Sequence, residues 1–332
     1  MTTTTPGSDA ANFDSYPMGP KLRSYLGRLP PDDLQQDDVD DGVAAAALTA
    51  FLRGYNPAWA REHGRLDPSR YVDLLDELVA MALPEAALDL ASYYHDIDLS
   101  SDFRAQLTLG VAAMLKGDYS VAEAHLRTAQ SLLPEEPAPY INLAQIFQRQ
   151  GRIDEAQVWC SAGLDAEPNN FALWDLTALV LRDVHGELMP DYLMAIAEKR
   201  LAWAGLSLAA NLTTTGDRYL KANLLERLYH QGERDPMFLI ELTGAYGVSG
   251  DLAKIPPIIW QAERLGTTGL PWQLHVHAAQ AQLALGQPDA ALAALGKAKR
   301  DQSLPDAARA ALLELEGEAR IAQAEAAPAQ PH

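Results

Sequence analysis

Residues 103–136 read FRAQLTLGVAAMLKGDYSVAEAHLRTAQSLLPEE, and residues 137–170 read PAPYINLAQIFQRQGRIDEAQVWCSAGLDAEPNN. The two segments align without a gap at an offset of 34 residues. The small or turn-forming residues that recur at this offset are Gly117 and Gly151, Ala122 and Ala156, Ala129 and Gly163, and Pro134 and Pro168. A fixed period of 34 residues with small residues at fixed places indicates a repeated helix–turn–helix unit.

Each recurring residue type has a physical reason to stand where it does. Gly117 lies between two helical patterns, where a tight turn often needs a positive φ. Ala122 stands where the two helices of a unit touch, because a large side chain there would push them apart. Gly110 is expected to do the same on the first helix, and Pro134 ends the second helix.

The pattern continues in weaker form on both sides of these two repeats. Upstream, Arg70–Ala82 and Glu85–Tyr94 form a degenerate pair that follows Pro68 and Pro84, with Ala87 at the small position. Downstream, Phe171–Arg182 is a sound first helix, but the segment from His185 to Pro190 interrupts the unit. A second helix is predicted from Pro190 through Ala204, which shortens this unit to about 31 residues.

The 34-residue period then returns. Gly216 and Gly250 mark turns in repeats at 202–235 and 236–269, and Gly286 marks one in a repeat at 272–305. A last helix from Asp306 to about Ala324 is predicted to close the array, with a polar outer face. The predicted organisation is an acidic, poorly ordered arm at 1–42 with a docking segment at Phe13–Leu29, arrays at 43–201 and 202–325, and a frayed tail at 326–332.

The 34-residue pattern resembles the tetratricopeptide repeat family. The resemblance implies an all-α fold, a right-handed superhelical solenoid of antiparallel helix pairs with a C-terminal capping helix. It also implies that the first helices line a groove that holds an extended or helical partner segment. By position, the expected groove residues are Arg104, Leu107, Val111, Met114, Ile141, Asn142, Gln145, Gln148, Arg149, Asp175 and Arg182.

One subtype of this family grips the acidic C-terminal tails of the Hsp70 and Hsp90 chaperones. That subtype places Lys and Asn on one repeat, Asn on the next, and Lys and Arg on the third. Here Asn142 matches, but the other four positions are Leu107, Val111, Ala172 and Leu176. We therefore expect a partner that is not an acidic tail of this type, because the groove is mixed apolar and amide.

Composition narrows the partners further. With 26 basic and 45 acidic residues the net charge is −19, which argues against nucleic acid and against anionic membrane surfaces. The lone Cys160 cannot form an internal disulfide and falls within an apolar helical pattern. The first residues contain no apolar signal segment, and no run is long enough to insert in a membrane, so we expect a cytoplasmic protein.

The sequence contains no motif that predicts catalysis, a cofactor or a metal. His275 and His277 lie two residues apart on a predicted helix, so they point to different faces and are expected to be ordinary packing or surface residues. The segment Tyr93–Asp96 at a helix end is explained by a histidine that complements the helix dipole. We expect no enzyme, no cofactor and no bound metal.

Two functions are consistent with these observations. The first is a non-catalytic scaffold or adaptor that binds partner protein segments in the groove. The alternative is a dedicated cytoplasmic chaperone or assembly factor for a secretion, pilus or motility machine. The sequence leaves open whether the chain's own N-terminal arm or C-terminal helix fills the groove, and whether the protein self-associates.

Overall fold

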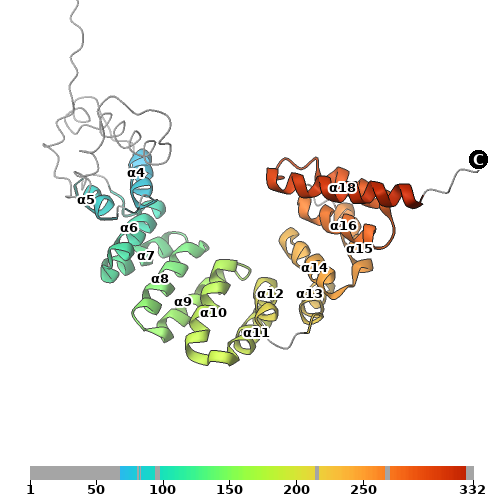
Figure 1. The fold of residues 1–332 in the computed structure, drawn as a ribbon. Helices are drawn as coiled ribbons and strands as arrows, with labels where there is room; N and C mark the ends of the chain where they lie inside the picture. Colours follow the sequence, from blue (N-terminus) through green and yellow to red (C-terminus); the bar gives the residue numbers. More distant parts are fainter. Residues whose placement is uncertain are drawn as a thin grey trace, which may run out of the picture. The chain divides into compact units, whose positions relative to one another are not determined.

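The computed structural model describes residues 68–80, 82, 84–93, 98–213, 217–265 and 270–326. Within this part of the chain the secondary structure is helical throughout, with no strand, as Figure 1 shows. The predicted arm at 1–42 with its docking segment, the predicted tail at 326–332 apart from Ala326, and the motif after Tyr93 lie outside the described residues. The chain divides into two compact units, Met1–Glu167 (unit 1) and Pro168–His332 (unit 2).

Unit 1 is a row of helices in which neighbours along the chain pack together. In order they are α4 (Pro68–Ala80), α5 (Pro84–Tyr93), α6 (Phe103–Lys116), α7 (Tyr119–Leu132), α8 (Pro137–Arg149) and α9 (Ile153–Ala166). The bounds of α6 to α9 confirm the two strong repeats. The degenerate pair α4 and α5 also exists, and it buries Val72, Leu75 and Ala87.

The predicted turns at Gly117, Gly151, Gly250 and Gly286 are confirmed by positive φ angles, whereas Gly216 lies outside the described residues. Gly117 and Gly151 have φ of +88° and +72°, the left-handed region that glycine adopts without steric cost. At the first turn the Gly117 N–H donates to Met114 O at 3.1 Å, and the Asp118 N–H donates to Ala113 O at 2.9 Å. These bonds satisfy carbonyl groups that the end of α6 would otherwise leave without partners.

Small residues are required at these positions because the two helices of each pair are in contact there. Ala122 and Ala156 are fully buried. A Cβ added at Gly110 of α6 would lie 2.6 Å from Cγ of Leu126 on α7, closer than real side chains approach. The close approach of these two helices therefore depends on glycine at position 110.

Unit 2 begins with a repeat of unusual length. The first helices of unit 2 are α10 (Phe171–His185), the 3₁₀ turn η2 (Gly186–Leu188), α11 (Met189–Arg200) and α12 (Trp203–Leu212). The predicted helix from Pro190 through Ala204 is wrong at its end, because α11 stops at Arg200. Leu201 takes a left-handed φ of +53°, and the Ala202 N–H donates back to Ala197 O at 3.0 Å, so Trp203 opens a new helix.

The remaining helices of unit 2 follow the returning period. They are α13 (Leu220–His230), α14 (Pro236–Ser249), η3 (Leu252–Lys254), α15 (Ile255–Arg264), α16 (Trp272–Ala284), α17 (Pro288–Ala298) and α18 (Asp306–Ala326). The long α18 packs on α17 and α16, as expected of a closing helix. Its outer face is less polar than predicted, because Leu313 and Ile321 are 61% and 62% exposed.

Aromatic side chains join α10, α12 and α14 in unit 2. Trp174 is fully buried, and its indole N–H donates to Pro168 O at 2.7 Å. The rings of Phe171 and Trp203 meet edge to face with centroids 5.3 Å apart, and Trp203 meets Phe238 at 6.1 Å. These contacts bury large apolar surfaces between successive first helices, which is the main source of stability in such an array.

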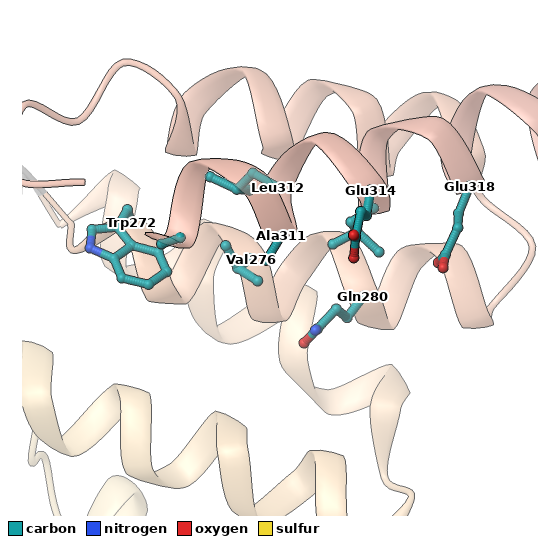
Figure 2. A pocket seen from close by; sticks show the side chains of 9 residues that line it. Trp272, Val276, Gln280, Ala311, Leu312, Glu314 and Glu318 are labelled. Atoms are coloured by element: carbon teal, nitrogen blue, oxygen red, sulfur yellow. The ribbon is translucent and has the colours of Figure 1, made fainter. Parts of the chain in front are cut away.

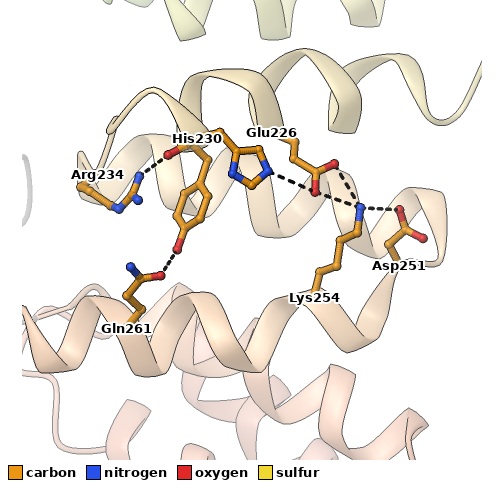
Figure 3. A network of polar contacts seen from close by, with 7 residues as sticks. Glu226, His230, Arg234, Asp251, Lys254 and Gln261 are labelled. Atoms are coloured by element: carbon orange, nitrogen blue, oxygen red, sulfur yellow. Dashed lines mark hydrogen bonds and ion pairs between the residues drawn. The ribbon is translucent and has the colours of Figure 1, made fainter.

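A polar network on the second helices links α13 to η3 and α15 (Figure 3). Lys254 lies 3.0 Å from the Glu226 carboxylate and 3.6 Å from Asp251. On the same side the Tyr229 hydroxyl donates to Gln261 at 2.5 Å. Exposed pairs of this kind contribute about 0–1 kcal/mol each, so the network fixes orientation more than it stabilises.

Candidate partner-binding surfaces

The predicted groove residues of unit 1 fall on α6 and α8, and most of them are accessible. Those that are partly or fully exposed are Arg104, Leu107, Val111, Ile141, Asn142, Gln145, Gln148 and Arg149. Met114 differs, because it is only 5% exposed and belongs to the core. The prediction that Met114 contacts a partner is corrected for that reason.

Two of these residues already have partners inside the unit. The Arg104 guanidinium lies 3.0 Å from Asp73 and 2.5 Å from Asp76, both on α4. Hydrogen bonds to Asp76 and Asp73 raise the pKa of Arg104 above its ordinary value. The Asn142 amide donates to Ala138 O at 2.8 Å, within its own helix. Apart from the exposed Arg149, the rest of this predicted groove surface is apolar and amide, and the charge of Arg104 is neutralised.

Four of the remaining groove residues form two pairs at the 34-residue spacing of the repeat. Leu107 and Ile141 occupy one position of the repeat, and Val111 and Gln145 occupy the position one helical turn later. Side chains four residues apart lie on one face of a helix, so each helix presents the same two-residue row. Asp175 and Arg182 are exposed on α10 of unit 2, and their membership of the same groove stays a prediction.

Unit 2 carries a polar row on its first helices that the sequence analysis did not identify. The Ser207 hydroxyl donates to Glu241 at 2.6 Å, and the Lys221 ammonium lies 2.7 Å from the same carboxylate. Two residues further along α14, the Thr243 hydroxyl is 2.8 Å from Nδ1 of His277. Both pairs join residues 34 apart, so the repeat period applied to polar residues would have found them.

Burial and charge shift the pKa values in this row. Burial opposes ionisation of Glu241, but the hydrogen bonds from Lys221 and Ser207 and the Lys221 charge outweigh it and lower its pKa. Burial lowers the pKa of His277, although the Glu241 carboxylate partly opposes this shift. The row therefore consists of an ionised, hydrogen-bonded glutamate beside a histidine that favours the neutral form.

This histidine predicts a pH dependence. Its pKa in the unfolded chain is about 6.5, and the folded value is lower, so the unfolded state binds more protons as pH falls. Between about pH 7.5 and about pH 5.5 the urea midpoint should fall, and His277→Gln should reduce that fall. The control is His230→Gln, because His230 is exposed on α13. Equal pH dependence in wild type and His277→Gln would contradict the assignment.

A pocket of about 340 Å³ lies between α16 and α18 (Figure 2). Its lining residues are Trp272, Val276, Gln280, Ala308, Ala311, Leu312, Glu314, Leu315 and Glu318. The three residues from α16 are spaced by four, so they form one stripe along the helix. That spacing was visible in the sequence, but its pairing with α18 was not.

The described residues contain no group of three or more His, Cys, Asp or Glu side chains that could hold a metal ion. His275 and His277 do not converge: His275 lies 3.9 Å from Glu263, whereas His277 meets Thr243. No described helix combines the length and the apolar composition needed to cross a bilayer. The described part of the chain is a repeated helical array with accessible surfaces and a pocket.

One known family has a model that matches part of this repeat array. Residues 113–180 match the family model of the tetratricopeptide repeat. This stretch covers most of the first strong repeat, the whole second repeat and most of α10. Residues 113–180 are therefore similar to tetratricopeptide repeats, in line with the 34-residue period of the sequence. Repeats of this family serve in general as scaffolds for interactions between proteins.

Solved structures give more distant likenesses. A tetratricopeptide repeat protein from Parabacteroides merdae ATCC 43184 is 16% identical, with a TM-score of 0.35, over 76% of this chain and 98% of that chain. A chain of the APC/C hetero-tetramer Cut9–Hcn1 is 15% identical, with a TM-score of 0.36, over 90% of this chain and 58% of that chain. No curated protein sequence matches. Neither structural likeness is close enough to carry a function to this chain.

Proposed function

We propose that this chain is a non-catalytic scaffold that binds a partner protein segment on the α6–α8 face of unit 1. The observation that supports this most is the repeated, partly exposed row of Leu107 with Val111 and Ile141 with Gln145. Apolar side chains beside amides suit a segment that supplies apolar anchors and backbone hydrogen bonds. The face offers no unpaired cationic cluster, because Arg104 is held by Asp73 and Asp76. An acidic tail is therefore a poor partner.

The test compares two single variants, one with a change on this face and one with the same kind of change elsewhere on the same repeat. Ile141→Glu should weaken retention of a partner about tenfold or more, because the segment would have to bury an unpaired carboxylate. The matched control is Val158→Glu, since Val158 is 65% exposed on α9, the second helix of the repeat. Retention is measured by pull-down from the native host with quantitative mass spectrometry. Equal recovery of the same partners by both variants would move the binding site elsewhere.

The same experiment separates the two predicted roles. A scaffold should retain a set of folded proteins, whereas a dedicated chaperone or assembly factor should retain a single client that aggregates without it. In both cases Ile141→Glu should lose what Val158→Glu keeps, since both roles use the same face.

A further inference from the structure

The pocket between α16 and α18 has an apolar floor and an acidic edge. Trp272 and Val276 of α16 face Leu312 and Ala311 of α18, and Figure 2 shows Trp272 at one end of the pocket. Glu314 and Glu318 lie toward the other end, one helical turn apart on α18. Residues at this spacing share a helix face, so both carboxylates border the same opening.

The two carboxylates at this edge are exposed, and neither forms an ion pair or hydrogen bond with any of the described residues. Two nearby cations, one just after α17 and one on α18, are already engaged by another carboxylate. Lys299 and Arg320 both pair with Glu316, which lies between the two pocket glutamates in sequence but points away from them.

The volume of the pocket suits a single inserted side chain of a peptide better than a large ligand. A volume of about 340 Å³ lies at the low end of the roughly 300–1,000 Å³ range of small-molecule pockets. An aromatic or leucine side chain inserted from a peptide would cover the apolar floor. A phosphate or carboxylate ligand would meet two carboxylates of like charge, which is unfavourable.

We propose that the α16–α18 pocket binds a basic amphipathic segment of a partner protein, with an apolar side chain on its floor and Lys or Arg beside Glu314 and Glu318. The charge of the opening and the net charge of −19 both favour a cationic partner in the encounter. This site lies in unit 2 and uses other residues than the α6–α8 face. Its success or failure is therefore independent of the proposed function.

The test uses two labelled peptides and the full-length protein. One is a twelve-residue peptide with two leucines four residues apart and three lysines, and its twin carries glutamate at the three lysine positions. Fluorescence anisotropy should show the lysine peptide binding at least about fivefold more tightly than its twin, as expected for two exposed ion pairs. Glu314→Lys with Glu318→Lys should reverse this preference. Ala311→Trp should abolish binding of the lysine peptide by filling the pocket.

Two controls accompany this test. Ala311 is exposed on α18, so its variant should retain the wild-type circular dichroism spectrum. Glu187→Lys with Asp191→Lys makes the same change of charge at exposed positions near the start of α11 and should leave binding unchanged. An equal loss in that variant would mean general charge attraction and would overturn the proposal. Equal binding of both peptides, or of neither, would also overturn it.

One further variant tests whether a basic stretch of this same chain occupies the α16–α18 pocket. Lys21, Arg23 and Arg28 lie beside Leu22 and Leu26 in the sequence, a basic and apolar stretch of the same chemistry. Changing the three cations to glutamate in the full chain should leave the affinity for the lysine peptide unchanged if the pocket serves a partner. A clear rise in affinity would assign the pocket to this stretch and would overturn the proposal.

Discussion

Replacing Gly205 with alanine is expected to lower the free energy of unfolding of unit 2 by about 3 kcal/mol. The added Cβ would lie 2.6 Å from Cε2 and Cζ2 of Trp174, where no real side chain sits. Trp174 cannot easily yield, because it is fully buried and its indole N–H is bound to Pro168 O. The measurement is urea unfolding followed by tryptophan fluorescence, in which buried Trp174 contributes to the signal.

The matched control is Gly317→Ala in α18. Nothing lies within 4 Å of a Cβ at Gly317, so alanine there should stabilise the helix by about 0.5–1 kcal/mol through its better helix propensity. The two variants make the same chemical change in helices of the same unit. If Gly205→Ala is no less stable than Gly317→Ala, the close packing of α10 on α12 is not as described.

Removing the side chain of Leu126 is the second change with a large expected effect. Leu126→Ala should cost about 2–5 kcal/mol, because the side chain is fully buried between α6 and α7 and its loss leaves a cavity. Gly110→Ala should cost about 1–3 kcal/mol for the opposite reason, since the new Cβ meets Cγ and Cδ2 of Leu126 at 2.6 and 2.8 Å.

The double variant tests whether these effects share one contact. With Leu126 shortened, the alanine at position 110 has room, so the double variant should be more stable than the sum of the two single changes implies. A coupling of about 1 kcal/mol or more, measured by chemical denaturation of all four proteins, would support the contact. Additive effects would show that Gly110 is required for a reason other than Leu126.

Much of the repeat architecture could be predicted because its cause is local or periodic. Gly117 and Gly151 adopt positive φ in the structure, and a glycine between two helical patterns indicates such a turn. Ala122 and Ala156 are buried at the positions where small residues were required. The end of α11 could not be predicted, because Leu201 is not a residue that normally adopts a left-handed φ.

The candidate surfaces could be predicted only in part from the sequence. The positions of Leu107 and Ile141 on the first helices follow from the 34-residue period, and both are accessible. The burial of Met114 and the neutralisation of Arg104 by Asp73 and Asp76 did not follow. Both depend on how α6 is covered by its neighbours, which the spacing within one helix does not encode.

By itself the sequence determined the helical class, the period and the turns, because each is set by residues a few positions apart or by their regular recurrence. The tertiary structure alone decided which distant residues meet. It placed Gly205 against Trp174, joined Thr243 to His277, and brought Trp272 of α16 to the same pocket as Leu312 of α18. Such contacts depend on the distance and angle between packed helices, which are set by all the side chains of an interface together.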